Sequence, residues 1–115
     1  MLENYLKKYF DYITMIRVIS RKAPLCTSVN FGLYVNRLSE LVQTQPGFIK
    51  SESFWCRDSD NIFSMSDWES EKHWEKWFKS KERREVVHAH RDCVNNEHFH
   101  TFHKTNNKFH NFFLL

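Results

Sequence analysis

Residues 45–77 read QPGFIKSESFWCRDSDNIFSMSDWESEKHWEKW, and this stretch decides most of the fold. Pro46-Gly47 is a strong turn signal. Residues 48–56 and 62–68 each alternate between two sets of side chains, as strands do. The run 57–61 between them is polar and turn-forming, so the segment predicts an antiparallel hairpin with a five-residue loop.

Helix signals follow the hairpin. Ser70 is a good N-cap residue, and Trp74, Trp77 and Phe78 recur at helical spacing after it. Ser80 can begin a further helical stretch that ends near His90.

The C-terminal part predicts one more strand. Residues 92–97 read as a polar linker, and residues 98–104 (HFHTFHK) as a strand. The apolar end, residues 109–115, is expected to extend or pair with that strand.

Upstream of the turn, the sequence predicts a strand and a helix. Residues 13–20 (ITMIRVIS) are β-branched and predict a first strand that ends at Ala23-Pro24. Thr27 or Ser28 can cap the helix. Its apolar stripe at spacings of three and four consists of Phe31, Tyr34, Val35, Leu38, Leu41 and Val42.

The predicted order is therefore β-α-β-β-α-β, an α+β fold of ferredoxin-like topology. It implies a four-stranded antiparallel sheet with both helices on one face. Two sheets packed face to face would cover the open face, which predicts a homodimer with an internal barrel. The large number of aromatic residues, with 11 Phe, 4 Trp and 4 Tyr, favours such an interface or a pocket. Residues 1–12 read as an N-terminal extension and residues 13–115 as one domain.

Composition limits the partners. The net charge of +3 comes from interspersed residues, which predicts neither a nucleic-acid nor a membrane partner. Cys26, Cys56 and Cys93 form no CxxC pair, so we expect reduced thiols and a cytoplasmic protein. Lys7 and Lys8 interrupt the N-terminal segment, and no stretch approaches the ~20 apolar residues of a membrane span.

The turn at Gln45–Ile49, the hairpin and the run WESEKHWEKW at residues 68–77 resemble the antibiotic biosynthesis monooxygenase family. The resemblance covers about residues 13–92. It implies a dimeric α/β barrel with a pocket between sheet and helices in each subunit. Members of this family include cofactor-independent monooxygenases that act on aromatic polyketides and quinols. A related branch degrades haem, and other members handle small signalling molecules.

The resemblance also implies candidate site residues. Trp77 matches the pocket Trp of the haem-degrading branch, although Trp74 and Trp77 are equally well explained as core residues. Trp68, Phe54 and Trp74 are candidates for holding a flat aromatic substrate. Together with Trp77, two polar residues are the catalytic candidates: Arg17 to stabilise the substrate anion and His88 to titrate near neutral pH.

Three functions stay open. The first is a monooxygenase that uses O2 and a small aromatic or quinol substrate without a permanent cofactor. The second is haem binding or degradation, with His88 or His90 on the iron. His88 lies eleven residues after Trp77, one position later than in the haem-degrading branch, and Arg17 replaces that branch's Asn. The third is a non-catalytic dimer that binds a small ligand.

Other chemistries find no motif. The two glycines, Gly32 and Gly47, exclude a Gly-rich phosphate loop. The four histidines of the tail are expected to be half-exposed strand residues rather than metal ligands; they are His98, His100, His103 and His110. We therefore expect no metal site.

Overall fold

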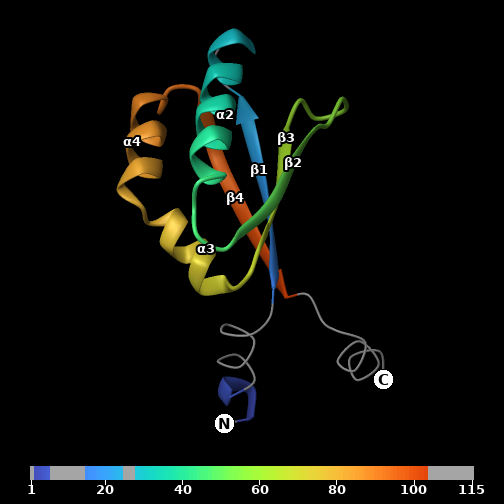
Figure 1. Cartoon of the computed structure of the whole chain (residues 1–115). Coiled ribbons are helices and arrows are strands. Elements are labelled where there is room, and N and C mark those ends of the chain that lie inside the picture. The colour runs from blue at the N-terminus through green and yellow to red at the C-terminus, as the bar shows by residue number, and fades with distance from the viewer. Residues whose placement is uncertain (1, 6–14, 25–27, 104–115) are drawn as a thin grey trace.

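The computed structural model describes residues 2–5, 15–24 and 28–103 (Figure 1). A short helical stretch at residues 2–5 precedes the main fold. The elements that follow are β1 (Ile16–Pro24), α2 (Ser28–Val42), β2 (Phe48–Trp55), β3 (Ile62–Trp68), α3 (Glu71–Phe78), α4 (Lys81–Ala89) and β4 (Val94–His103). The predicted order of strands and helices is confirmed, with two short helices before the last strand.

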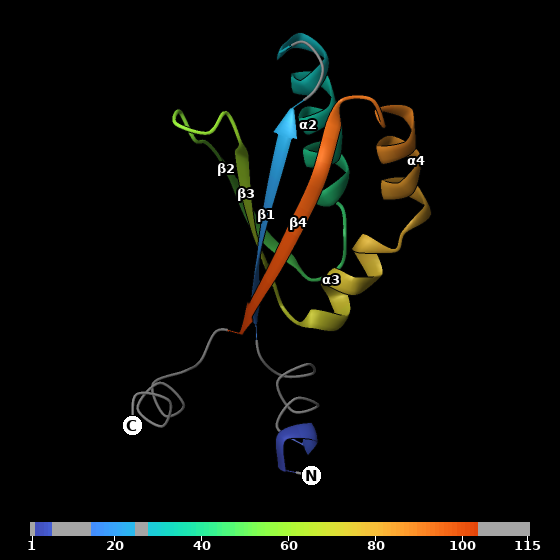
Figure 2. The same cartoon turned by 180° about the vertical axis from the view of Figure 1, so that it is seen from behind.

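The four strands form one antiparallel sheet in the order β2-β3-β1-β4. Helices α2, α3 and α4 all lie on one face of it, and turning the molecule by 180° brings the other, uncovered face into view (Figure 2). We call these the covered face and the open face. This arrangement confirms the predicted α+β ferredoxin-like fold.

One strand boundary was predicted incorrectly. β1 (Ile16–Pro24) ends at the predicted stop, Ala23-Pro24, whereas β4 begins earlier than expected. The last residues of β1 pair with Val94 and Asn95, so the expected polar linker at residues 92–97 is strand from Val94 onward. The polar composition misled the prediction because β4 is an edge strand, where polar residues are common.

The hairpin and the helix caps follow the prediction. The backbone N–H of Cys56 donates to the carbonyl of Asn61 across the loop. Ser70 and Ser80 are the N-caps of α3 and α4, each accepting a hydrogen bond from the backbone N–H three residues later. Of the two cap candidates for α2, Ser28 is the first residue of the helix, and Thr27 lies outside the described residues, as do residues 6–14 and 104–115.

Gly47 is required at the turn before β2. Its φ is +81°, and a Cβ atom there would lie 2.2 Å from the ring of His73 on α3. A side chain would therefore push the turn away from the first turn of α3, so only glycine allows this close approach.

The core fills the space between the covered face and the helices. Its main cluster consists of Ile16, Val18, Val42, Trp68 and Trp77. A second cluster joins α2 to α4. Within the described ranges, no helix is long and apolar enough to cross a membrane.

Candidate functional site

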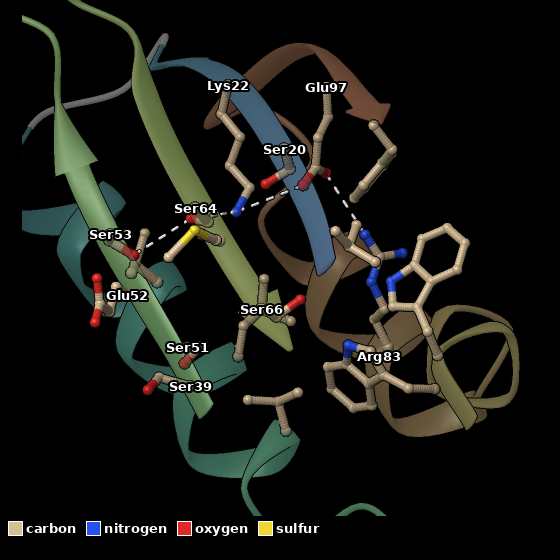
Figure 3. A pocket seen from close by; sticks show the side chains of 18 of the residues that line it. Ser20, Lys22, Ser39, Ser51, Glu52, Ser53, Ser64, Ser66, Arg83 and Glu97 are labelled. Carbon is tan, nitrogen blue, oxygen red and sulfur yellow. Dashed lines mark hydrogen bonds and ion pairs between the residues drawn. The ribbon is translucent and has the colours of Figure 1, made fainter. Parts of the chain in front are cut away.

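A cavity of about 380 Å³ lies between the covered face and the helices (Figure 3). All four strands contribute to its lining, together with α2, α3 and the first turn of α4. Its volume falls near the lower end of small-molecule pockets, which span ~300–1,000 Å³. The cavity is therefore suited to a ligand of two or three rings at most.

Serine hydroxyls form one wall of the cavity, which we call the serine floor. Cross-strand pairing aligns Ser20, Ser64 and Ser53 in one row and Ser66 with Ser51 in the next. Ser53 Oγ and Ser64 Oγ are 3.3 Å apart. Ser20 is buried whereas Ser51 and Ser53 are exposed, so the cavity opens beside β2. Each hydroxyl can donate and accept a hydrogen bond, which suits the oxygen atoms of a ligand.

Three charged residues form the inner end of the cavity, which we call the charged end. Glu97 on β4 lies between Lys22 on β1 and Arg83 on α4 (Figure 3). Its two oxygens are each 3.5 Å from one cation, Oε1 from Lys22 Nζ and Oε2 from Arg83 Nη2. Lys22 Nζ also donates to Ser64 Oγ at 3.5 Å, which joins the charged end to the serine floor.

The charged end is shielded from water. The exposed fractions of the side chains are 7% for Lys22, 11% for Arg83 and 15% for Glu97. Burial lowers the pKa of Lys22 because it penalises the ammonium form, and the Glu97 carboxylate opposes this shift. Burial likewise raises the pKa of Tyr34, and the negative charge of Glu97 raises it further.

An aromatic wall adjoins the serine floor: Trp74 and Trp77 belong to α3, whereas Phe99 on β4 pairs with Ser20 and lies in the same row of the sheet. Trp74, Trp77 and Phe99 line the cavity, and the rings of Trp74 and Phe99 lie 6.0 Å apart. The guanidinium carbon of Arg83 lies 4.5 Å from the ring centre of Phe78 and 5.6 Å from that of Phe99. These cation–π contacts fix the guanidinium at the edge of the aromatic wall.

Of the five non-histidine candidates, the structure brings two into the cavity. Trp74 and Trp77 line it, and Trp77 also belongs to the main core cluster, so the two interpretations of this residue are compatible. Trp68 is fully buried in that cluster, and its Nε1–H donates to Ser66 Oγ at 2.9 Å. Trp68 therefore holds the Ser66 hydroxyl from the neighbouring core and does not line the cavity. Phe54 is exposed on the open face.

Arg17 also lies on the open face. Strand alternation turns Val18, Ser20 and Lys22 toward the cavity and Arg17 away from it. The Arg17 guanidinium forms a bidentate ion pair with Asp67, with Nε–Oδ1 at 2.8 Å and Nη2–Oδ2 at 3.1 Å. The hydrogen bond to Asp67 raises the pKa of Arg17 further. Arg17 is thus placed to pair across the sheet and not to contact a ligand in the cavity.

The two histidine candidates lie away from the cavity. His88 is exposed in the last turn of α4. His90 is the C-cap of that helix, where its Nδ1 is 3.0 Å from the carbonyl of Val86 and its ring lies 5.5 Å from Tyr34. No imidazole lines the cavity among the residues that the structure describes, so those residues do not fit a haem with a histidine-bound iron.

The polar residues of the cavity were missed in the sequence, although one signal was present. Both arms of the hairpin carry a Ser-x-Ser pair, Ser51 with Ser53 and Ser64 with Ser66, which places four hydroxyls on one face.

In the described ranges, no group of three or more His, Cys, Asp or Glu is arranged to hold a metal ion. His98 and His100 are exposed, and His110 lies outside these ranges.

The fold and the cavity together define a class of protein, a ferredoxin-like domain with a cavity between its sheet and its helices. The family model of antibiotic biosynthesis monooxygenases matches residues 31–105, which is more than half of the chain. The chain therefore belongs to the antibiotic biosynthesis monooxygenase family, and the resemblance seen in the sequence is confirmed.

Solved structures share the fold at low sequence identity. SnoaB, a cofactor-independent oxygenase from Streptomyces nogalater, is 14% identical with a TM-score of 0.72, covering 82% of this chain and 96% of its own. A conserved protein from Methanosarcina mazei is 16% identical with a TM-score of 0.65, covering 84% and 99%. A protein from Pseudomonas aeruginosa is 11% identical with a TM-score of 0.66, covering 83% and 98%. No curated protein sequence matches the chain.

Proposed function

We propose that this protein is a monooxygenase that oxidises a small flat aromatic substrate, such as a quinol or an anthrone, with O2 and without a bound cofactor. The observation that carries the proposal is the cavity itself, which Trp74, Trp77 and Phe99 line together with a floor of serine hydroxyls. Family membership and the shared fold of SnoaB, whose name describes a cofactor-independent oxygenase, support the same chemistry.

Binding requires an electron-rich ring that lies flat against the aromatic wall. Aromatic rings stack or meet edge to face, and such pairs contribute about 0.5–1.5 kcal/mol beyond the area they bury. The ring oxygens would then face Ser64 and Ser66 on β3, whose hydroxyls can donate hydrogen bonds to them.

Catalysis would begin with ionisation of the substrate. An acidic O–H or benzylic C–H loses its proton to solvent at the mouth beside β2, and the serine hydroxyls stabilise the oxyanion that forms. The anion donates one electron to O2, and the resulting radical and superoxide combine to a peroxide. For an anthrone, protonation and loss of water convert the CH2 group to a carbonyl, so that one oxygen atom enters the product and the other leaves as H2O. In this scheme hydroxyls of the serine floor take the role expected for Arg17.

We also propose that the protein acts as a homodimer, through its open face. Strand alternation places an apolar set of residues on that face, which includes Ile19, Phe54, Phe63 and Phe102. Phe54 and Phe102 are half exposed or more, and exposed apolar patches of this kind mark interaction sites. The Arg17–Asp67 ion pair neutralises the charges at one end of the same face.

Oxygen consumption tests the proposed reaction. With an anthrone as substrate, we expect enzyme-dependent uptake of one O2 per carbonyl formed. Ser64→Ala should lower kcat on the order of 100-fold, because it removes a hydroxyl that stabilises the anion. Ser59→Ala, in the exposed hairpin loop, is the matched control and should leave the rate unchanged. Ligand binding without oxygen uptake across quinols and anthrones would favour a non-catalytic binding protein instead.

A further inference from the structure

The charged end of the cavity holds more positive than negative charge. At this end Lys22 and Arg83 share the carboxylate of Glu97, which leaves a local formal charge of +1. The second carboxylate in the cavity lining, Glu52, is exposed on β2. Each cation–oxygen distance is 3.5 Å, longer than the ~2.7–2.9 Å of a close charge-assisted hydrogen bond. Glu97 thus bridges the two cations and saturates the donors of neither.

Burial makes this surplus charge significant. Lys22 and Arg83 are each nearly nine-tenths buried or more, and their tips lie in the same cavity. An ionised group removed from water is costly unless a partner of opposite charge accompanies it. The surplus on the protein side is therefore suited to a ligand that brings one negative charge into the cavity.

The aromatic wall next to the charged end indicates which class of anionic ligand fits the cavity. Phe99 lines the cavity and lies beneath the Arg83 guanidinium, while Trp74 and Trp77 continue the wall away from it. A ligand with its anionic group at Lys22 and Arg83 would lay its flat body on these rings. A sugar or other polyol anion would leave that apolar surface unused.

We propose that the cavity binds flat aromatic carboxylates, with the carboxylate held between Lys22 and Arg83 and the ring against Trp74, Trp77 and Phe99. This inference rests on the proposed function and deepens it by naming the substrate class, an aromatic acid. The serine floor would then face the ring, where the position that ionises and reacts lies. Lys22 is a specificity-determining residue in this arrangement.

A matched pair of ligands tests the inference without any turnover. 2-Naphthoate and 2-naphthamide have the same shape and differ in charge, and their binding can be followed by calorimetry. We expect the carboxylate to bind at least about tenfold more tightly, because a hydrogen bond to a charged group contributes about 1.5–3 kcal/mol. Lys22→Met should abolish this preference, whereas Lys79→Met, at the exposed C-cap of α3, should preserve it.

Glu97→Gln provides the second, opposite test. This substitution removes the negative charge that pairs with Lys22 and Arg83, so 2-naphthoate should bind several-fold more tightly to the variant than to the natural protein. A purely structural role for the charged end predicts weaker binding in both variants. Opposite changes in Lys22→Met and Glu97→Gln are therefore specific to an anion site, and Glu97→Gln is informative even if Lys22→Met fails to fold.

Three outcomes would overturn the inference. They are equal affinities of the natural protein for the two ligands, weaker naphthoate binding in Glu97→Gln, and displacement of naphthoate by an equal concentration of inorganic phosphate. Failure of this inference can be distinguished from failure of the proposed function. Oxygen uptake with a neutral anthrone but no preference for the carboxylate contradicts only the inference. Naphthoate binding without oxygen uptake with any quinol, anthrone or hydroxylated naphthoate contradicts only the monooxygenase proposal.

Discussion

The two faces of one sheet use polar and apolar residues in opposite ways. On the covered face, Ser20 and Lys22 are buried among core residues. On the open face, the charged Arg17 pairs with Asp67 while Phe54 and Phe102 are exposed to solvent. Buried polar groups and exposed large apolar groups are the two informative deviations from ordinary packing. The first supports the proposed ligand site on the covered face, and the second supports the proposed dimer interface on the open face.

The largest expected effect concerns assembly through the open face. Purified protein should have twice the 14.1 kDa mass of the chain in light scattering at micromolar concentration. A dimer that is stable at micromolar concentration has a free energy of dissociation of about 8 kcal/mol. Phe102→Glu should convert it to a monomer, because the substitution places a charge within an apolar interface.

Leu33→Glu is the matched control for assembly. Leu33 on α2 is 58% exposed and Phe102 on β4 is 53% exposed, so the two substitutions differ mainly in the face they alter. Leu33→Glu should leave the dimer intact. A monomeric natural protein, or a dimer that survives Phe102→Glu, would show that the open face is covered in another way.

The next largest effect concerns the core beneath the covered face. Trp68 is 0% exposed and packs edge to face on Phe48, with ring centres 5.4 Å apart. Trp68→Ala should lower the free energy of unfolding by about 3–5 kcal/mol, because it leaves a large cavity in the core. It also removes the hydrogen bond that the Trp68 indole N–H donates to Ser66 Oγ. Urea unfolding at a fixed protein concentration measures the change.

Trp55 provides the comparison at the exposed end of the hairpin. Its side chain is 61% exposed, so Trp55→Ala should change the free energy of unfolding by less than about 1 kcal/mol. Similar losses for the two tryptophans would mean that stability does not depend mainly on the buried end of the covered face.

The fold was predictable because its signals are local. The alternation in the hairpin, the turn at Gly47 and the caps Ser70 and Ser80 each act within a few residues, and all were recognised in the sequence. The start of β4 was missed because Val94 and Asn95 are strand residues only through pairing with the distant end of β1.

The site was less predictable because alternation does not tell which face of a strand the helices cover. Arg17 and Lys22 both interrupt an apolar strand, and they point to opposite faces. Choosing Arg17 by alignment with the haem-degrading branch selected the open face. The charged end brings together β1, β4 and α4, a juxtaposition that depends on the tertiary fold and leaves no spacing signal in the sequence.

The smallest expected effect concerns Tyr34, which packs behind the charged end. Burial and the Glu97 carboxylate raise its pKa above the ordinary 10.0, so the native protein keeps this phenol protonated when the unfolded chain has lost the proton. The native state then binds more protons than the unfolded state, and stability falls as the pH rises above about 10. Tyr34→Phe should remove this loss while changing stability little at pH 7.

A comparison of Tyr34→Phe with the natural protein isolates this contribution. Lys22 acts in the opposite direction, because its lowered pKa makes stability rise with pH up to its ordinary value of 10.5. Both proteins retain Lys22, so its contribution cancels in the difference between their urea midpoints at pH 9 and pH 11. Tyr5→Phe removes an exposed hydroxyl and should keep the natural profile. If Tyr34→Phe also keeps that profile, Tyr34 ionises as readily in the folded protein as in the unfolded chain, and the charged end is more hydrated than its buried side chains indicate.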